Sequence, residues 1–532
     1  MIKYLSVLIL FFFSINVFAQ NQQKQNPDVE LPDFVITGKD IIKVRQAKKI
    51  PPDFITIISE QFVKPIFPPA DLPVKEIQTP VKGSFDTIDS LNFLRGKVDA
   101  SIGAYSIPSA DFVFTNPFPN GLFEIYANAL NQRAYIPNSE RYFINGGTNL
   151  MLYVNNQSGF LPGTELKFHG DFGTDSYKFF GSDFPLIKRY YNKGSASISV
   201  NNTLYKSFNF SLDANDRLSS FRNEKFSENL FNILGSAKLS IQSFNLGFNL
   251  NYKKQFITNN FFGNGIFNYI YVQPYIGLDF SKVLKVSLGF NYSKTDTDKS
   301  FSPYVGLGIN LGNGLTLFGR YSPASEFYGG GHFADENPYF DASNFTNIFE
   351  KKKTAFNAVL KYEYFTYFEI DGGFKYYSSD NLPYFSDSLH KGRFELLTTS
   401  GKYLTGFINM LFHLGPYGVF YGSAEASSVR NSSNKILPYY PEVKLTLNYG
   451  YDFNFGLNAQ ANLQYYFKQY TDIQNNITLN PYVNLGLKFT YKWRPNFDLI
   501  LKLQNLTNSK NYLWNNYREL PLDISGGISV KW

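Results

Sequence analysis

Residues 483–493 read Val-Asn-Leu-Gly-Leu-Lys-Phe-Thr-Tyr-Lys-Trp, a strict alternation of apolar and polar side chains. Successive side chains of a β-strand point to opposite faces, so this stretch predicts a strand with one apolar and one polar face. The segments 443–450 and 453–465 alternate in the same way. Alternation alone fits two architectures. In a soluble sandwich the apolar faces form the core, whereas in a membrane barrel they face lipid.

Two features of these segments favour the membrane barrel. Their polar face uses mainly Asn, Gln, Lys and Gly, and their apolar runs end in Tyr, Phe or Trp, as an interfacial aromatic girdle requires. The segments are also about 10 residues or longer, whereas strands of soluble sheets have about 5 to 6 and membrane-spanning strands need about 9 to 11.

Connection lengths give a third argument, because short and long connections alternate along the chain. The predicted short turns lie at 201–202, 242–243, 281–282, 312–314, 415–416, 451–452 and 494–496. The predicted long, polar loops lie at 174–191, 218–228, 323–350, 379–390, 429–438, 468–479 and 507–521. Turns at one end and loops at the other are typical of outer-membrane barrels, whose short turns are periplasmic.

The composition agrees with an all-β protein. Of 532 residues, 18% are aromatic and 17% charged, and the mean hydropathy of -0.23 is too low for a bundle of membrane helices. The absence of Cys excludes disulfides and thiolate metal sites. A net charge of +7 is small for this length and gives no support for nucleic-acid binding.

The first 90 residues predict export and a separate arm. Lys3 precedes an apolar run over 5–13, and Ala19 ends a signal-peptidase-like site, so residues 1–19 are predicted to be a signal peptide; the alternative is a membrane anchor. Residues 20–90 contain nine prolines and predict an extended periplasmic arm or a reduced plug. Residues 91–532 are then a transmembrane antiparallel barrel in the outer membrane of a Gram-negative-type bacterium, where lipid and the barrel-assembly machinery are expected partners.

The predicted barrel has about 22 strands, an even number because both chain ends lie on the turn side. The weakest strand predictions are 94–105, 108–115 and 391–413, and 16 or 18 strands are the alternatives. The last strand is predicted to close the barrel against the first. Its outward residues are Leu522, Ile524, Ile528, Val530 and Trp532.

Two parts of the chain carry a family resemblance. The C-terminal part has Asn505-Leu506-Thr507-Asn508, then Tyr512, Tyr517, Pro521, Gly526-Gly527 and Trp532. It resembles the closing hairpin of TonB-dependent outer-membrane receptors. Near the start, Asp33-Phe34-Val35-Ile36-Thr37-Gly38 resembles the short box through which that family pairs with the periplasmic protein TonB. The resemblance implies a 22-stranded barrel and TonB as a partner.

The chain also departs from that family. The segment between Gly38 and residue 91 is too short for the family's plug domain, and Leu522 follows the proline where the family usually has Gly or Arg. A plug-less or plug-reduced relative is therefore expected. A 22-stranded lumen is wide and is normally occluded. The arm, inward-folded loops such as 323–350, or a separate plug or periplasmic protein would have to fill it, and loops together with a partner are favoured.

The loop around residues 328–341 is the most distinctive candidate site. Gly329-Gly330-Gly331 gives it backbone freedom, and His332, Asp335, Glu336 and Asp341 are predicted to bind a cation or a polar ligand. The alternative is a solvated loop that turns back over the pore. No catalytic motif, metal-ligand spacing or cofactor site is evident, so an enzyme is not expected.

Three functions remain open from the sequence. The leading hypothesis is a transport or receptor component that binds a ligand at its extracellular loops and passes it through a gated lumen, with or without TonB. The second is a passive porin-like channel. The third is a structural or assembly barrel that anchors a partner protein.

Overall fold

The computed structural model describes residues 95–154, 161–202, 207–260, 263–281, 283–364 and 367–532. The predicted signal peptide (1–19), the arm (20–90) and the box from Asp33 to Gly38 lie outside these residues. The described residues contain no helix of the length and hydropathy needed to cross a membrane.

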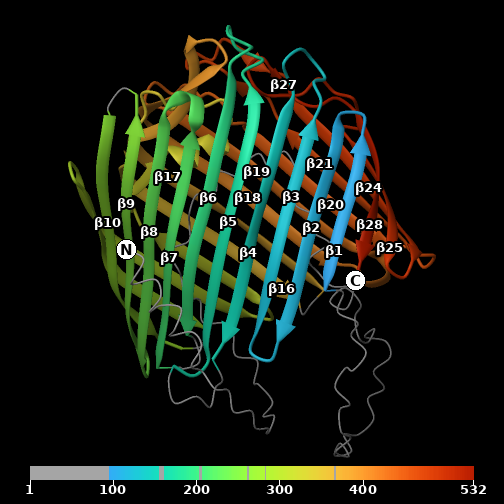
Figure 1. Cartoon of the computed structure of the whole chain (residues 1–532). Coiled ribbons are helices and arrows are strands. Elements are labelled where there is room, and N and C mark those ends of the chain that lie inside the picture. The colour runs from blue at the N-terminus through green and yellow to red at the C-terminus, as the bar shows by residue number, and fades with distance from the viewer. Residues whose placement is uncertain (1–94, 155–160, 203–206, 261–262, 282, 365–366) are drawn as a thin grey trace, which may run out of the picture. The chain divides into compact units, whose positions relative to one another are not determined.

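Twenty-two strands form one sheet (Figure 1). They are β1 (Gly96–Gly103), β2 (Ser106–Phe118), β3 (Gly121–Gln132), β4 (Arg141–Tyr153), β5 (Thr164–Lys178), β6 (Lys188–Asn202), β7 (Phe208–Phe221), β8 (Phe226–Ile241), β9 (Phe244–Asn259), β10 (Gly263–Asp279), β11 (Leu284–Thr295), β12 (Lys299–Gly312), β13 (Leu315–Tyr321), β16 (Lys352–Tyr364), β17 (Phe368–His390), β18 (Arg393–His413), β19 (Val419–Asn431), β20 (Val443–Asp452), β21 (Leu457–Tyr466), β24 (Tyr482–Arg494), β25 (Phe497–Gln504) and β28 (Asp523–Lys531).

The remaining elements lie in the connections between these strands. They are η2 (Arg222–Glu224), β14 (Glu326–Gly329), α3 (Gly330–Glu336), β15 (Asn347–Glu350), η3 (Gly415–Tyr417), β22 (Gln469–Tyr470), β23 (Thr478–Leu479), β26 (Tyr512–Trp514) and β27 (Tyr517–Arg518).

The sheet closes on itself. Each strand pairs antiparallel with the next strand of the sheet, and β28 pairs antiparallel with β1 in a register that places Val530 opposite Val98. The prediction of a 22-stranded antiparallel barrel is thus confirmed, and the alternatives of 16 or 18 strands are wrong. The weakest predicted strands correspond to β1, β2 and β18.

The two faces of the sheet have opposite chemistry, as the alternation predicts. Apolar side chains such as Leu288 and Ile276 are half exposed on the outside of the barrel. Amide side chains face inward and are buried, and they hydrogen-bond across the strands: Asn249 to Gln273 at 2.7 Å, and Gln273 to Asn291 at 2.7 Å. Exposed apolar and buried polar residues are the reverse of a soluble sandwich, so the sandwich alternative is excluded.

The connections divide between two ends of the barrel. One end, here called the turn end, carries short connections such as 242–243, 313–314 and 495–496. The other, called the loop end, carries 322–351, 432–442, 467–481 and 505–522 and lies at the top of Figure 1.

Several boundary predictions are wrong. Parts of the predicted loops 174–191 and 218–228 belong to strands β5 to β8, and the predicted turns 201–202 and 451–452 belong to β6 and β20. Residues 379–390 form the end of the 23-residue strand β17 and not a loop, because they pair with β18. Leu522 precedes the last strand, which begins at Asp523. Asp523 instead fixes the start of that strand, because its carboxylate accepts hydrogen bonds from the Tyr105 N–H at 3.0 Å and the Ser106 hydroxyl at 2.9 Å.

Substitutions in β11 test whether the outward face of the barrel contacts lipid. Leu288 lies midway along β11 on the apolar face, and its neighbour Ser287 faces the lumen. Leu288→Arg is expected to lower the free energy of unfolding by about 2–4 kcal/mol, because it places a guanidinium in hydrocarbon. Ser287→Arg is the matched control and should have a much smaller effect. Urea unfolding of the protein in lipid vesicles measures both, and equal losses would contradict a lipid-facing Leu288.

Candidate functional site

The connection between β13 and β16, residues 322–351, folds into the loop end of the lumen and is here called the inner loop. Its two sides pair as the short hairpin β14–β15, with Glu326 opposite Glu350, and its tip is the helix α3. Buried aromatic residues of the loop pack against aromatic residues of the barrel strands. The loop is therefore part of a core inside the barrel. It turns back over the lumen, as the alternative prediction states, but most of its aromatic residues are buried, and ligand binding by the loop stays a prediction.

Three consecutive glycines allow the inner loop to touch the barrel wall. A Cβ atom at Gly329 would lie 2.6 Å from a carboxylate oxygen of Glu228 on β8, and one at Gly330 would lie 2.6 Å from the ring of Phe226. A Cβ at Gly331 would lie 2.3 Å from the hydroxyl of Ser219 on β7. The three glycines thus allow the backbone of the inner loop to lie directly against the barrel wall, because a side chain at any of them would clash with a wall residue.

Glu228 holds the start of α3. The helix has no side-chain cap of its own, and the carboxylate of Glu228 accepts hydrogen bonds from the N–H groups of Gly330 at 2.6 Å and Gly331 at 3.1 Å. The same carboxylate accepts a hydrogen bond at 2.8 Å from Gln255 on β9. A carboxylate at the first turn of a helix satisfies N–H groups that have no partner within the helix.

Asp335 anchors α3 to the strands β6 and β7. Its carboxylate pairs with the guanidinium of Arg217 and lies 3.4 Å from the ammonium of Lys193, and it accepts a hydrogen bond at 3.1 Å from Tyr191. Arg217 also donates to the carbonyl of Gly331 at 2.7 Å. Arg217 thus binds α3 at two points, the backbone carbonyl of Gly331 and the side chain of Asp335.

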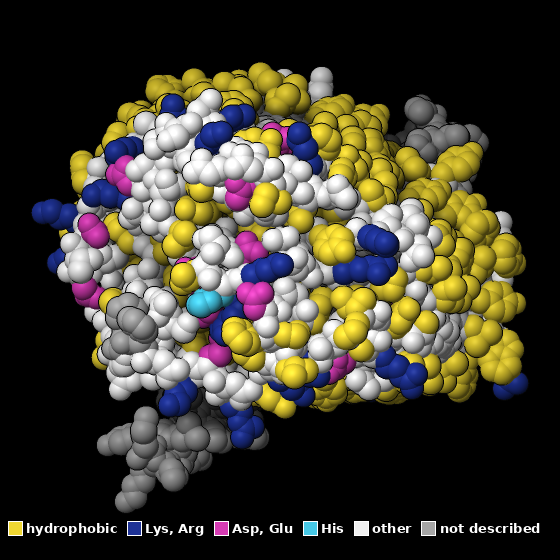
Figure 2. Space-filling view, turned by 90° about the horizontal axis from the view of Figure 1, so that it is seen from above, with side chains coloured by type: hydrophobic (Ala, Val, Ile, Leu, Met, Phe, Trp, Pro, Cys, Tyr) yellow, Lys and Arg dark blue, Asp and Glu magenta, His cyan; other side chains and the backbone are white. Residues whose placement is uncertain are grey.

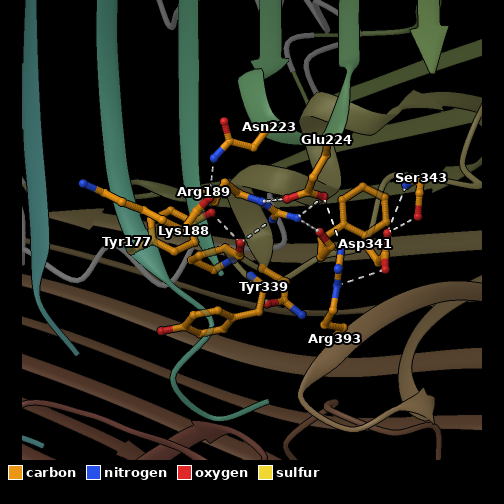
Figure 3. A network of polar contacts seen from close by, with 12 residues as sticks. Tyr177, Lys188, Arg189, Asn223, Glu224, Tyr339, Asp341, Ser343 and Arg393 are labelled. Atoms are coloured by element: carbon orange, nitrogen blue, oxygen red, sulfur yellow. Dashed lines mark hydrogen bonds and ion pairs between the residues drawn. The ribbon is translucent and has the colours of Figure 1, made fainter. Parts of the chain in front are cut away.

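Arg189 on β6 holds the segment after α3 (Figure 3). Its side chain is fully buried and donates two hydrogen bonds of 2.6 Å to Glu224, which lies in η2. It also donates to the carbonyls of Pro338 and Phe340, each at 2.7 Å. The guanidinium carbon lies 4.0 Å from the centre of the Phe221 ring. A buried charge needs this many partners to offset its desolvation.

The same network extends to the opposite side of the lumen. Arg393 at the start of β18 lies 3.3 Å from Glu224 and 3.1 Å from Asp341 of the inner loop. The two arginines and two carboxylates therefore link the wall at β6, the inner loop and the wall at β18 (Figure 3).

Aromatic contacts complete the closure. Tyr339 of the inner loop stacks on Tyr517 of the 505–522 loop, with ring centres 3.4 Å apart. Phe333 and Phe340 each lie with ring centres 6.2 Å from that of Phe385 on β17. Viewed from the loop end, polar and charged side chains cover the face above the lumen, and hydrophobic side chains lie along the barrel's flank (Figure 2).

The four predicted ligand-binding residues do not converge on one point. Asp335 and Asp341 are used in ion pairs with the wall. His332 and Glu336 line a separate cavity, where burial lowers the pKa of His332 to about 4 and raises the pKa of Glu336 to about 7. No group of three or more potential metal-binding side chains occurs within the described part of the chain.

Sequence reasoning missed the wall residues that hold the loop: Arg189, Arg217, Glu228 and Arg393. Inward polar positions of the strands fit a hydrated lumen wall equally well, and only contact with the inner loop distinguishes them. The one available signal is their place near the loop end of their strands, where a folded-in loop would meet them.

Comparisons with known proteins support the fold. No protein-family model matches the sequence, and no curated protein matches it. Several solved structures share the architecture. The siderophore receptor PirA from Acinetobacter baumannii is 9% identical, with a TM-score of 0.60 over 82% of this chain and 80% of that one. The ferric enterobactin receptor PfeA from Pseudomonas aeruginosa, in complex with enterobactin, is 12% identical, with a TM-score of 0.60 over 82% and 81%.

The copper transporter OprC is 11% identical, with a TM-score of 0.59 over 82% of this chain and 80% of that one. At these identities the likeness shows the fold alone. The chain thus shares the barrel architecture of these solved structures.

Substitution of the buried Arg189 tests whether this residue anchors the inner loop. Arg189→Met keeps much of the side-chain volume but leaves Glu224 with Arg393 as its remaining arginine and leaves two carbonyls without the Arg189 donor. Breaking one partner of a buried ion pair costs about 3–5 kcal/mol, so we expect the inner loop to become sensitive to proteases at concentrations that leave the wild type intact. Lys188→Met, which changes the exposed neighbour on the same strand, is the control. Equal resistance of both variants would contradict the anchoring role.

Proposed function

We propose that this protein is a transport or receptor component of the outer membrane of a Gram-negative-type bacterium, and that its inner loop is the gate. One observation carries the proposal: a loop of the chain itself crosses the lumen and is bound to walls on both sides. The solved structures with this barrel are receptors and a transporter by their names, which supports the same general role here.

The contacts of the inner loop suit a gate. On the side of β6 to β9 the loop is held by hydrogen bonds and ion pairs, whose strength depends on the exclusion of water. On the side of the 505–522 loop it is held by aromatic rings, such as the stacked pair Tyr339 and Tyr517. A ligand that bound at the loop end and displaced the 505–522 loop would remove the aromatic contacts of the inner loop. The hydrogen bonds and ion pairs to β6 to β9 would remain.

The loop's ends favour movement as a unit. Glu326 and Glu350 are partners in the β14–β15 hairpin, so the loop leaves and re-enters the wall at adjacent points. Movement about this hairpin would open the lumen without separating any strands of the barrel.

Shortening the inner loop tests the gate. Replacing residues 327–349 by two glycines joins paired positions through a two-residue hairpin turn. The full chain with this change is expected to show a severalfold larger steady conductance in planar bilayers than the wild type, because the lumen loses its cover.

A second variant locks the loop in place. An added Cβ at Gly331 would lie 3.0 Å from the Cβ of Ser219, close to the 3.5–4.5 Å of disulfides, and the chain has no other Cys. Ser219→Cys with Gly331→Cys should keep conductance at its lowest level when oxidised and release it on reduction, whereas Ser219→Cys alone should not respond. An unchanged conductance in the shortened variant would refute the gate.

Coupling to TonB is a further part of the proposal and depends on the segment from Asp33 to Gly38. Its sequence suits an extended strand that adds to the edge of a partner's sheet. A peptide of residues 29–40 is expected to bind the purified C-terminal domain of TonB, and the same peptide with Ile36→Pro should bind at least about tenfold more weakly, since proline removes a ladder hydrogen bond. Titration calorimetry measures both.

The alternative is a passive porin-like channel constricted by its own loop. The inner loop supports this alternative, because the segment that narrows the lumen is part of the barrel chain itself. No partner protein is then needed to constrict the channel. Absence of binding by the peptide of residues 29–40, together with large conductance of the shortened variant, would select this alternative.

A further inference from the structure

A small cavity lies beside α3, between the inner loop and the strands β17 and β18. Its lining includes Glu336 from α3 and Glu350 from β15, together with aromatic rings from the loop and the wall. The enclosed space of about 30 Å³ has room for about two water molecules. The surrounding space, part of which is open to solvent, totals about 470 Å³. The cavity thus has room for a group of about the size of one or two water molecules.

One carboxylate oxygen in this cavity lacks a partner. Glu350 is 1% exposed, and its Oε1 has no partner at hydrogen-bonding geometry among the described residues, although the Ser379 hydroxyl lies close enough to the carboxylate to oppose the rise of its pKa. The other oxygen, Oε2, is 3.4 Å from the Tyr328 hydroxyl and 3.9 Å from the ammonium of Lys352. Leaving a buried carboxylate oxygen unpaired is costly, so such an atom calls for an explanation.

Charged groups of both signs surround the cavity: Lys253 and Lys375 act on Glu326, and Lys444 acts on Glu336. Lys352 is the lysine in contact with Glu350, and it also pairs with Glu326 at 2.7 Å. Glu336 makes no ion pair or hydrogen bond with another described side chain, and Lys444 acts on it only from a distance. Glu326 and Glu350 thus share Lys352 in direct contact, whereas Glu336 has no cation in contact with it among the described residues.

The aromatic walls are of the kind that binds cations. Tyr377 and Tyr403 are stacked with ring centres 4.7 Å apart, and the ammonium of Lys352 already lies 4.6 Å from the centre of the Tyr377 ring. The Tyr440 hydroxyl lies within the electrostatic reach of both Glu336 and Glu350, which contribute, after burial, to the raised pKa of this tyrosine. Aromatic faces combined with carboxylates favour a desolvated ammonium group.

We propose that this cavity binds the ammonium group of a small primary amine. The ammonium would donate hydrogen bonds to Oε1 of Glu350 and to the carboxylate of Glu336, with aromatic rings around it. The site belongs to the closed inner loop and does not need the loop to move, so it stands apart from the proposed gate.

Proton binding competes with this site. Burial raises the pKa of Glu350 to about 7, with Lys352 opposing and Glu326 adding to the shift, and burial raises the pKa of Glu336 to about 7 as well. Both carboxyls are ionised well above pH 7 and protonated well below it. The affinity for an ammonium must therefore fall as the pH is lowered from 8 to 6. His332, whose pKa is lowered to about 4, stays neutral over this range.

The probe is methylammonium chloride, titrated by calorimetry into the full chain in detergent at pH 8. We expect saturable heat, with no comparable heat from potassium chloride at equal ionic strength. Glu350→Gln and Glu336→Gln should each weaken binding at least about tenfold, since each removes a charge-assisted hydrogen bond. Glu363→Gln, which alters a glutamate that pairs with Lys361 near the turn end, should bind as the wild type does.

Three results would overturn the proposal. The first is absence of saturable heat, or equal heat from potassium. The second is unchanged affinity in Glu336→Gln, a variant whose carboxyl makes no ion pair or hydrogen bond with another described side chain and whose folding is checked by circular dichroism. The third is proton uptake between pH 8 and 6 that methylammonium does not alter, which would assign the cavity to protons alone. Conductance plays no part in these measurements, so failure here leaves the gate untouched.

Discussion

The pairing of β28 with β1 is the constraint on which the rest of the structure depends. Hydrocarbon offers no hydrogen-bond partners, so a sheet can cross it only if every strand edge is paired. Closure at 22 strands meets that requirement and simultaneously sets the circumference. The resulting lumen is too wide for wall side chains to fill. The need for a cover over the lumen follows from the strand number.

The inner loop meets that need by building a second core of ordinary protein type inside the barrel. Its rings pack with those of β5 to β8 on one side and of β17, β18 and the 505–522 loop on the other. The polar contacts that hold it are concentrated on few residues, chiefly Arg189, Arg217 and Glu228. This arrangement attaches a separately folded element to a rigid wall, and under the proposed function that element would be the one that moves.

The sequence predicts the barrel well because the signal is repeated in every strand. The strict alternation in 483–493 and the parity of turns and loops both follow from the membrane, and neither depends on particular contacts. Prediction from the sequence fails where contacts between distant residues determine the local structure. Residues 379–390 look like a polar loop, yet they extend β17 because β18 is equally long and pairs with them.

The site was predicted only in part for the same reason. Gly329 to Gly331 and the acidic residues after them mark the inner loop as unusual, but the pattern indicates flexibility and ligand binding where the structure shows close packing and ion pairs. Whether Asp335 meets a ligand or Arg217 is determined by the folding of one loop across the lumen. The sequence around Asp335 does not indicate which distant residue will be its partner.

The β14–β15 hairpin has an evolutionary consequence. Because the inner loop joins the wall through two adjacent, paired positions, everything beyond Glu326 and Glu350 can be exchanged as a cassette without altering the shear or the closure of the cylinder. A replaced insert would still have to come with matching wall residues, because Arg217, Glu228 and Arg393 contact the present loop, whereas the strand pairing of the cylinder would be inherited unchanged.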